Sequence, residues 1–353
     1  MINSVIMQDM KDIESRSEDW SWLWDKAVLV SGAYGMLPSY IVYFLIYLNE
    51  THPEHRTDIV AVGRNAEKMK ARFGRFCSKE YFHILNADIC GPIRPELHID
   101  YIIHAASPAS PQYYSVSPVN TLLPNTLGTY NLLELARRDK SLGLLFFSSG
   151  DVYGKVPDDT PTVTETDYGY IDPMNVRSCY GESKRMGETM CKAWSHQYGV
   201  PAKSVRIYHT YGPTLDLAND KRMFAEFVNN IVNSEDIVMK SDGSAVRAFC
   251  YIADATDAFF RILKDGDPGT AYNMCNSGCR ISVAELAQTL VSLFPEKELK
   301  VRRVERAQNS SYMESPVKVV TKISTERLES LGWKPKYDIK AGFGRTINSF
   351  VQE

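Results

Sequence analysis

A short apolar run, a glycine turn and a long apolar segment follow one another in AVLVSGAYGMLPSYIVYFLIYLNE, residues 27–50. A continuous apolar run of this length is typical of a strand buried on both faces of a sheet. Gly32 and Gly35 would let the backbone turn tightly into a helix, whose free N–H groups and dipole favour an anion such as a diphosphate. A G-x-x-G turn alone is common, so the rest of the chain must support this interpretation.

The turn departs from a full dinucleotide-binding fingerprint because Pro38 stands where a third glycine is expected. Proline fits in a first helical turn, where its missing N–H would have no helical partner anyway. The close contact between helix and strand that glycine would allow is less certain here.

Strand-like and helix-like segments continue to alternate after this unit. Such alternation predicts right-handed parallel βαβ units and a doubly wound α/β sheet of the Rossmann type. The expected strands are 58–62, 82–86, 101–105, 143–148 and 203–208, and the expected helices include 66–73, 124–138 and the segment that begins near residue 180.

The alternation weakens after about residue 208, where helices are expected at 222–233, 254–264, 282–294 and 341–351. We therefore expect a dinucleotide-binding domain at 27–205 and a smaller α/β substrate-binding lobe at 206–353. Residues 1–26 read as an arm with an amphipathic helix. Its three alternating tryptophans would pack onto the body or onto a second subunit.

Ligands of doubly wound sheets bind at the carboxyl ends of the strands. Chemically useful residues follow five of the expected strands in this chain. They are Gly32, Arg64, Asp88, the pair Ala105 and Ala106, and the pair Ser148 and Ser149.

Tyr180 and Lys184 are separated by one helical turn in CYGESKRMGE, so they would share one helix face. A nearby ammonium, with a bound cationic nicotinamide ring, would lower the pKa of the phenol and let it act as a base. Tyr180 would then take a proton from a sugar hydroxyl while hydride leaves the same carbon. An isolated Tyr-x-x-x-Lys pair is more often solvated helix surface.

The composition is that of an ordinary enzyme-sized globular protein. The formal net charge of -3 gives no basic excess for nucleic acid, and no apolar stretch approaches the roughly 20 residues that span a bilayer. The seven cysteines are scattered without a C-x-x-C pair, so we expect neither disulfides nor a metal site. The N-terminus lacks the pattern of a secretory signal, and we expect a cytoplasmic protein.

With these motifs in view, the chain from Ala27 onward resembles the extended short-chain dehydrogenase/reductase family of nucleotide-sugar enzymes (NAD-dependent epimerases and dehydratases). Its strongest similarity is to the UDP-glucuronate decarboxylases. The resemblance rests on an ordered set of motifs: SGAYG (31–35), Asp88-Ile89, HAASPASPQYY (104–114), NTLGT (125–129), SSGDVYG (148–154), RSCYGESKRMGE (177–188), YGP (211–213) and RAFCYIAD (247–254).

The resemblance implies roles for individual residues. Ser149, Tyr180 and Lys184 would form the hydride-transfer triad beside Asp151, and Asn125 would support the lysine through its helix. The alternatives are a strand-end cap for Ser149 and a plain helix-turn residue for Asn125. The cofactor-binding residues would be Gly32, Tyr34, Gly35, Met36, Arg64, Asp88, Ile89, Ala105 and Ala106, and the substrate-binding residues Ser107, Arg177, His209, Arg222 and Arg247.

Three departures from the decarboxylase pattern bear on function. Those enzymes have Ser-Thr-Ser-Glu where this chain has Ser-Ser-Gly-Asp at 148–151, and asparagine where it has His209. The acidic residue expected after the second strand is replaced by Gly63-Arg64. An arginine there more often meets a 2′-phosphate and so leans toward NADP, although it could instead stack on adenine.

Decarboxylation of a UDP-hexuronate through a 4-keto intermediate is therefore one hypothesis, with NAD or NADP as cofactor. A 4-ketoreductase or 4-epimerase acting on a nucleotide-linked sugar is a second, and a non-catalytic dinucleotide sensor is a third. Family members commonly pair through two long helices, so we expect a homodimer formed through 124–138 and 181–198. The apolar stripes of those helices could instead be core that faces the sheet.

Overall fold

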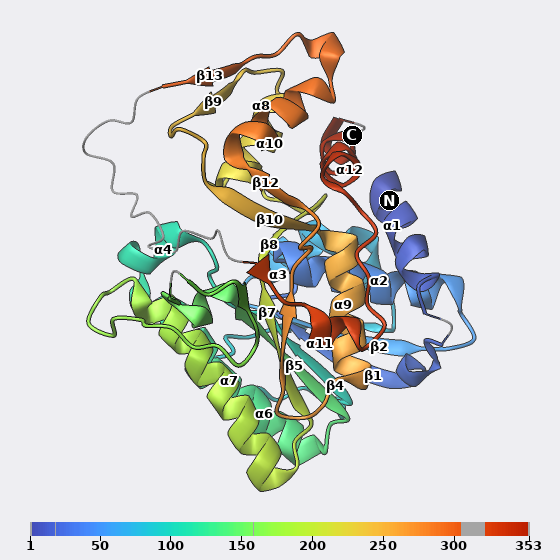
Figure 1. The fold of residues 1–353 in the computed structure, drawn as a ribbon. Coiled ribbons are helices and arrows are strands. Elements are labelled where there is room, and N and C mark those ends of the chain that lie inside the picture. Colours follow the sequence, from blue (N-terminus) through green and yellow to red (C-terminus); the bar gives the residue numbers. More distant parts are fainter. Residues whose placement is uncertain (1, 18, 158, 305–321, 352–353) are drawn as a thin grey trace.

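The computed structural model describes residues 2–17, 19–157, 159–304 and 322–351 (Figure 1). A large sheet with helices on both faces carries a smaller lobe at one end. The strands are β1 (Lys26–Ser31), β2 (Thr57–Gly63), β3 (Phe82–Asn86), β4 (Tyr101–His104), β5 (Gly143–Ser149), β6 (Thr162–Val163), β7 (Ala202–Ile207), β8 (His209–Tyr211), β9 (Ile237–Met239), β10 (Val246–Tyr251), β11 (Ala271–Met274), β12 (Arg280–Ser282), β13 (Val301–Arg303) and β14 (Lys322–Ile323).

The helices connect and cover these strands. The α-helices are α1 (Ser4–Glu14), α2 (Met36–Thr51), α3 (Ala66–Phe73), α4 (Pro111–Val116), α5 (Pro118–Leu123), α6 (Thr129–Asp139), α7 (Ser178–Tyr198), α8 (Met223–Val232), α9 (Ile252–Asp265), α10 (Val283–Ser292), α11 (Glu326–Glu329) and α12 (Ile339–Val351). Short 3-10 or π turns are η1 (Ser21–Leu23), η2 (Gly74–Ser78), η3 (Pro124–Gly128), η4 (Gly150–Tyr153) and η5 (Pro295–Lys297).

Within the described residues the large sheet has the order β11-β7-β5-β4-β1-β2-β3, and every neighbouring pair is parallel. Its central strands are buried on both faces, because α2 and α9 pack on one side and α6 and α7 on the other. The predicted doubly wound parallel sheet is confirmed. All of its strands end at the same edge, which collects the residues that follow them.

The edge strand β11 was not predicted from the sequence. It pairs with β7, for example Tyr272 with Val205, although it comes from the segment assigned to the C-terminal lobe. A four-residue strand gives too short a periodic signal to be recognised alone. The proposed division at 205/206 falls within β7, and β11 shows that the chain returns to the large sheet after entering the smaller lobe.

The smaller lobe is built around β12, β10 and β8, with β9 and β13 paired beside them and α8, α10 and α12 packed against them (Figure 1). Helix α10 begins with a capping box in which Ser282 and Glu285 bond each other's backbone N–H groups. The lobe stands over the carboxyl ends of β5 and β7, because β8 follows β7 after a single residue.

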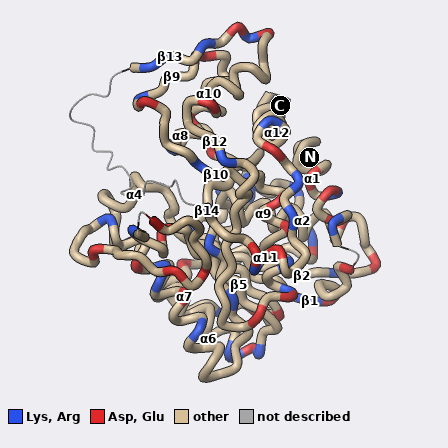
Figure 2. Tube along the Cα trace, viewed as in Figure 1, with Lys and Arg blue, Asp and Glu red and all other residues tan. Residues whose placement is uncertain are grey.

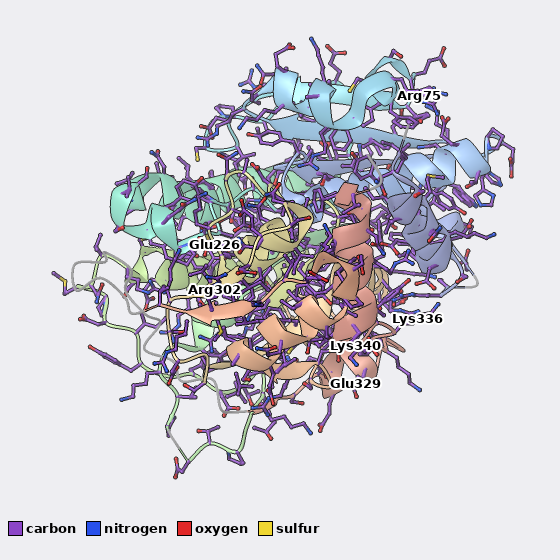
Figure 3. The ribbon with its side chains drawn as sticks, turned by 90° about the horizontal axis from the view of Figure 1, so that it is seen from above. Arg75, Glu226, Arg302, Glu329, Lys336 and Lys340 are labelled. Carbon is purple, nitrogen blue, oxygen red and sulfur yellow. The ribbon has the colours of Figure 1, made fainter. Side chains whose placement is uncertain are left out.

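The N-terminal arm packs on the body of its own chain. Trp20 contacts Phe44 and Phe260, with ring centroids 4.6 and 5.5 Å apart, and Trp22 lies edge-on to Tyr101 at 5.0 Å. Of the two arrangements open from the sequence, the structure shows packing onto the body. Lys336, at the surface near this arm, pairs with Asp12 of α1 (Figure 3).

Acidic and basic residues are interspersed over both lobes (Figure 2). No helix within the described residues is long and apolar enough to cross a membrane. The described part of the chain also holds no group of three or more His, Cys, Asp or Glu side chains arranged to bind a metal ion.

Candidate active site

The glycine turn after β1 is closely packed against the turn after β4. Gly32 has φ +69°, and a Cβ there would lie 2.9 Å from the Cα of Ala106, so only glycine fits. The Gly35 N–H donates to the Gly32 carbonyl at 2.8 Å, and Gly35 then caps α2 without a side chain. This leaves the first N–H groups of α2 facing the edge where the strands end, which suits a diphosphate.

The first turn of α2 also meets the smaller lobe. Pro38 is buried in that turn, as predicted. Thr214 donates a hydrogen bond to the Met36 carbonyl at 2.9 Å, and an Arg222 nitrogen lies 3.7 Å from the Met36 sulfur. Met36 therefore joins the predicted cofactor side of the site to a predicted substrate residue.

Tyr34 lies against the end of β2. A Cβ on residue 63 would be 2.8 Å from the ring of Tyr34, so Gly63 is the residue that makes room for it. The Lys68 ammonium lies 6.0 Å from the centre of that ring. The sequence placed Tyr34 along the diphosphate, whereas its ring reaches the neighbourhood of Arg64.

Arg64 and Asp88 line a small hollow together with Asn86 and Ala87, at the carboxyl ends of β2 and β3. Their charged groups lie 3.9 Å apart, and both side chains are at least half exposed. This puts two of the predicted cofactor residues in direct electrostatic contact.

Three other predicted cofactor residues lie close to this edge. Ile89 packs against Gly128, where a Cβ would be 2.6 Å from its side chain. The backbone N–H groups of Ala105 and Ala106 both donate to the Ser31 hydroxyl at 3.1 Å. His104, which the sequence gave no role, holds the other side of that hydroxyl at 3.0 Å.

The predicted triad is assembled at the end of β5. Tyr180, on the first turn of α7, lies near Ser149, whose side chain lowers the pKa of the phenol. The Lys184 ammonium lies 5.6 Å from the Tyr180 ring centre and donates to the Phe147 carbonyl at 2.6 Å. Ser149 also accepts a hydrogen bond from the Asp151 N–H, so it acts as a turn cap as well as a neighbour of the phenol.

Burial dominates the electrostatics of the triad in the protein without ligand. It raises the pKa of Tyr180, and the Asp151 charge raises it further, against smaller opposite effects from Ser149, Arg222 and Tyr114. Burial also lowers the pKa of Lys184 to about 7. The predicted lowering of the phenol pKa therefore depends on the positive charge of a bound nicotinamide ring, because loss of water outweighs the ammonium alone.

Asp151 and Arg177 flank the phenol. The pKa of Asp151 is raised because protein atoms crowd the carboxyl even though solvent reaches it, and Arg177 opposes this rise. Tyr114 stacks on Tyr180 with centroids 4.7 Å apart, and Arg177 lies over Tyr114 at 5.9 Å. Tyr114 has no predicted role; only its place in the motif at 104–114 could have drawn attention to it.

Asn125 lies in the π turn η3, a distortion often found at functional sites. Its amide nitrogen donates to the Ser183 hydroxyl and to the Thr121 carbonyl, both at 3.0 Å. Asn125 therefore supports α7 one residue before Lys184.

Three of the predicted substrate residues, His209, Arg222 and Arg247, come from the smaller lobe and its junction with the large sheet. Asp220 holds Arg222 through paired hydrogen bonds of 3.0 and 2.5 Å. Burial lowers the pKa of His209 to about 3, helped by the charges of Arg247 and Arg222, so the imidazole is neutral near pH 7. The charges of both arginines therefore reach the imidazole of His209.

A buried support network lies behind the triad. Ser148 donates to Glu188 at 2.5 Å, and Arg206 holds the same carboxylate at 2.7 Å. Ser148 is thus committed to the core, whereas Ser149, the serine that the resemblance placed in the triad, lies near Tyr180.

Buried side-chain polar atoms without a hydrogen-bond partner are rare in folded proteins and call for an explanation. Among the described residues such atoms are the Ser107 hydroxyl, the Asn125 carbonyl oxygen and the Tyr208 hydroxyl. All of them lie beside the strand ends that carry the triad. Two were predicted as site residues, and Tyr208 was not.

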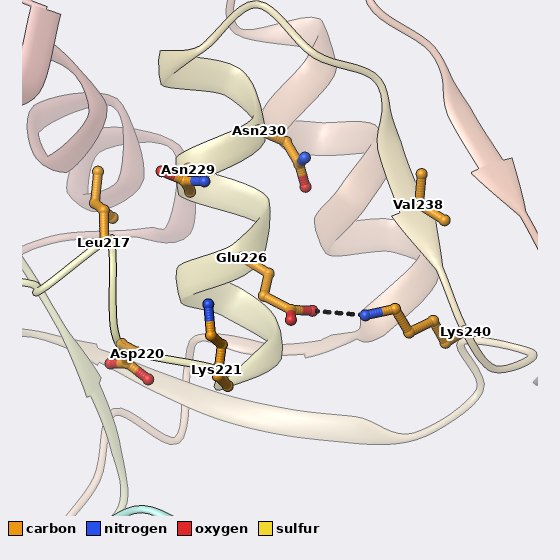
Figure 4. Close-up of a pocket in the computed structure, with 8 residues that line it drawn as sticks. All are labelled: Leu217, Asp220, Lys221, Glu226, Asn229, Asn230, Val238 and Lys240. Atoms are coloured by element: carbon orange, nitrogen blue, oxygen red, sulfur yellow. Dashed lines mark ion pairs between the residues drawn. The ribbon is translucent and has the colours of Figure 1, made fainter. Parts of the chain in front are cut away.

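A second hollow, of about 230 Å³, lies on the smaller lobe and is bordered by α8 and β9 (Figure 4). Glu226 and Lys240 form an ion pair of 3.6 Å across it. It is lined by Leu217, Asp220, Lys221, Glu226, Asn229, Asn230, Val238 and Lys240. Since Asp220 also holds Arg222, this hollow adjoins the predicted substrate residues.

Comparisons with known proteins agree with this geometry. Residues 28–275 match the family described as the NAD dependent epimerase/dehydratase family. UDP-glucuronic acid decarboxylase 5 of Arabidopsis thaliana is 30% identical over 318 residues, which cover 89% of this chain and 86% of that protein. UDP-glucuronic acid decarboxylase 1 of Danio rerio is 30% identical over 328 residues, covering 93% of this chain and 73% of that one.

The fold also matches solved structures. A UDP-glucuronic acid 4-epimerase from Bacillus cereus, in complex with UDP-glucuronic acid and NAD, has a TM-score of 0.74 and 18% identity. The match covers 92% of this chain and 99% of that one. At this identity the likeness supports the fold alone.

Proposed function

Because the chain belongs to the NAD-dependent epimerase/dehydratase family of enzymes, we propose that it oxidises the sugar of a UDP-linked hexuronate at C4 and decarboxylates it. The carrying observation is the grouping of Ser149 at the end of β5 with Tyr180 on α7, and with Lys184 one turn further along that helix. The curated relatives named above support decarboxylation as the outcome.

The residues present fit a dinucleotide. Gly32 lets the first turn approach the strand ends, and the N-terminus of α2 offers free N–H groups to a diphosphate. The unpartnered Asn125 oxygen adds a buried acceptor near Lys184. When bound, the nicotinamide supplies the hydride acceptor for C4 and returns the hydride after CO2 has left.

Tyr180 would remove the proton from the C4 hydroxyl, and Ser149 would hold that oxygen in place. The resulting ketone lies β to the C6 carboxylate, so the electron pair of the breaking C5–C6 bond is accepted as an enolate. C5 of the enolate would take a proton from solvent, and Tyr180 would give its own proton back to the C4 oxygen as the ketone is reduced, so the cycle would be redox-neutral overall.

The charges of the site suit an anionic substrate. Arg222 is held in place by Asp220, and the charges of Arg222 and Arg247 meet at His209. Guanidinium groups offer paired donors to phosphate oxygens. We assign these arginines to the diphosphate and Arg177, which faces Asp151 and Tyr114, to the sugar end.

Analysis of the products tests the proposal directly. The purified protein with NAD and UDP-glucuronate is expected to release one CO2 per UDP-pentose formed, without net consumption of cofactor. Detection of unchanged UDP-glucuronate after prolonged incubation, with the fold confirmed by circular dichroism, would refute it.

The substitution of Ser-Gly-Asp at 149–151 favours a second candidate, a 4-epimerase or 4-ketoreductase, because it alters the groups next to C4. The same product analysis, with a second reaction that contains NADPH and a 4-keto sugar nucleotide, separates the three reactions. UDP-galacturonate without CO2 would indicate epimerisation, and stoichiometric loss of NADPH with a 4-keto sugar would indicate reduction.

We also propose that the protein forms a homodimer through α5, η3, α6 and α7. These elements expose large apolar side chains: Val119 (64% exposed), Leu127 (42%), Tyr130 (44%) and Met186 (50%).

Met186→Glu is expected to convert a dimeric mass in light scattering to a monomeric one. Leu142→Glu, an equally exposed apolar position in the loop before β5, is the control and should leave the mass unchanged. A monomeric wild type at micromolar concentration would refute the dimer.

A further inference from the structure

Gly150 and Tyr208 form a close contact beside the triad. A Cβ on residue 150 would lie 2.7 Å from the Tyr208 ring, so a serine or alanine there would displace the ring. Gly150 directly follows Ser149 at the end of β5, and Tyr208 directly follows β7, its neighbour in the sheet. The glycine therefore makes room for a phenol at the edge where ligands bind.

The Tyr208 hydroxyl is shielded from solvent and has no hydrogen-bond partner among the described residues. The polar groups around it are already engaged. The Tyr153 hydroxyl donates to Asn273 and accepts from Arg206, and Arg206 holds Glu188. An unpaired buried hydroxyl destabilises the folded protein, so a contribution to function would account for its presence.

One charged neighbour of Tyr208 also acts on the candidate catalytic tyrosine. Asp151, whose charge acts on both Tyr208 and Tyr180, lies one residue beyond Gly150. Tyr208 thus borders the same space as Ser149, Asp151 and Tyr180. Burial raises the pKa of Tyr208, so its hydroxyl remains a neutral donor at the working pH.

We propose that Tyr208 is a substrate-binding residue, whose hydroxyl donates a hydrogen bond to an oxygen of the bound sugar beside C4. The ring lies on the face of Gly150 where another residue would carry a side chain. A small rotation of the ring there brings the hydroxyl to the sugar. The inference rests on the proposed function, since it takes the sugar of a nucleotide-linked substrate as the occupant of this space.

Tyr208→Phe tests the proposal because it removes only the oxygen. Protein saturated with NADH, which cannot oxidise the sugar, is titrated by calorimetry with UDP-glucuronate and, separately, with UDP. The variant is expected to bind UDP-glucuronate about tenfold more weakly and UDP within twofold of wild type. Its melting temperature without nucleotide is expected to be equal to or above that of wild type, because an unpaired hydroxyl has been removed.

Tyr272→Phe is the matched control. Tyr272 is a buried tyrosine of β11, away from the triad, and its hydroxyl accepts a hydrogen bond from the Asp267 N–H at 2.8 Å. This variant should lose melting temperature and keep its affinity for UDP-glucuronate, the reverse of the pattern expected for Tyr208→Phe.

Equal loss of affinity for UDP and UDP-glucuronate, or no loss for either, would overturn the role of Tyr208. Failure of the proposed function gives a different result. If wild type forms no CO2 yet Tyr208→Phe selectively loses affinity for the sugar nucleotide, decarboxylation is refuted and the Tyr208 contact stands.

Discussion

Two buried polar centres of this protein are built in opposite ways. In the first, Asp9 of the N-terminal arm is fully buried and accepts hydrogen bonds from Tyr40, Tyr251 and Arg345. These partners come from α2, β10 and α12, so one carboxylate joins the arm to both lobes. In the second, the catalytic centre, Lys184 donates to a single carbonyl.

The catalytic centre also keeps polar atoms of Ser107, Asn125 and Tyr208 without partners among the described residues. A satisfied buried network stabilises a fold, whereas an unsatisfied one lowers stability and remains ready to bind. The difference indicates that the arm centre holds the lobes together, and it is what we expect if the candidate catalytic centre gives up stability for chemistry. Each prediction below changes one of these two centres.

The largest effect is expected from Tyr180→Phe. Removing the oxygen that transfers the proton should lower kcat by about 100-fold or more, since positioned acid–base groups contribute on this scale. Cofactor affinity and melting temperature should stay close to those of wild type. A variant that retains more than about a tenth of the wild-type kcat in a product assay would refute the assignment.

Asp9→Ala is expected to show the opposite pattern. It removes the shared acceptor of two buried tyrosine hydroxyls and of the partly exposed Arg345, and breaking a buried pair costs about 3 to 5 kcal/mol. Denaturant unfolding followed by circular dichroism measures this loss. The kcat of the protein that remains folded should be unchanged.

Asp19→Ala is the control within the same arm, because Asp19 is exposed, caps the local turn at Ser21 and otherwise makes a surface ion pair with Lys264. Its unfolding midpoint should lie close to that of wild type. Equal destabilisation by both substitutions would show that the arm has no buried centre of special importance.

The sequence predicted the parts of the molecule that depend on local patterns. The buried strands, the glycine turn and the helical spacing of Tyr180 and Lys184 are each written in adjacent residues, and parallel strands bring their ends together. Contacts between distant residues were not predictable in this way. The contacts of Gly150 with Tyr208 and of Asp9 with Arg345 are examples. The strand β11 is another, because it joins the sheet by pairing with β7 and is too short to show a periodic sequence pattern of its own.

The depth to which the triad is buried could not be predicted for a related reason. Helical spacing fixes which charges lie close to the phenol, but it does not give the depth of burial. In the structure burial is the largest influence on both Tyr180 and Lys184. The outcome therefore depended on how β5, α7 and α4 close around the pair.

The third prediction concerns Lys184 and pH. Its pKa is about 7 in the fold and near 10.5 when solvated, so the unfolded chain binds an extra proton between these values. Stability should consequently rise with pH through this window, by about 2 kcal/mol once relaxation is allowed for, at about 1.4 kcal/mol per pKa unit. Lys184→Met should lack this rise.

Unfolding in denaturant at pH 7 and pH 9.5 measures the difference. The comparison between wild type and variant cancels the titration of other groups. Parallel pH dependence of the unfolding free energy in the two proteins would show that Lys184 does not lose its proton on burial. Burial of Lys184 would then not lower the stability of the folded protein.

The smallest effect is expected at the exposed rim of the cofactor site, where neither kind of buried network operates. The Tyr34 ring covers Gly63, so a side chain with a carboxylate at position 63 would displace that ring. Arg64 is then the neighbouring charged residue expected beside the ribose of the cofactor. An exposed charge-assisted contact to a 2′-phosphate contributes about 1 kcal/mol, or up to about tenfold in affinity. We therefore expect wild type to bind both cofactors, with NADP(H) equal or favoured, and Arg64→Asp to shift the preference toward NAD(H).

Asp88 makes this prediction sharper because it lies 3.9 Å from Arg64 and competes with a 2′-phosphate for the same guanidinium. Asp88→Asn should remove the competitor and raise NADP(H) affinity, the opposite direction to Arg64→Asp, while NAD(H) affinity changes less in both variants. Fluorescence titration of each reduced cofactor into stripped protein measures the ratio. A wild type that prefers NAD(H) by tenfold or more, with a ratio that neither substitution moves, would show that Arg64 does not read the 2′ position. That result would favour a decarboxylase that recycles tightly held NAD, because such an enzyme gains nothing from drawing on a pool of NADPH.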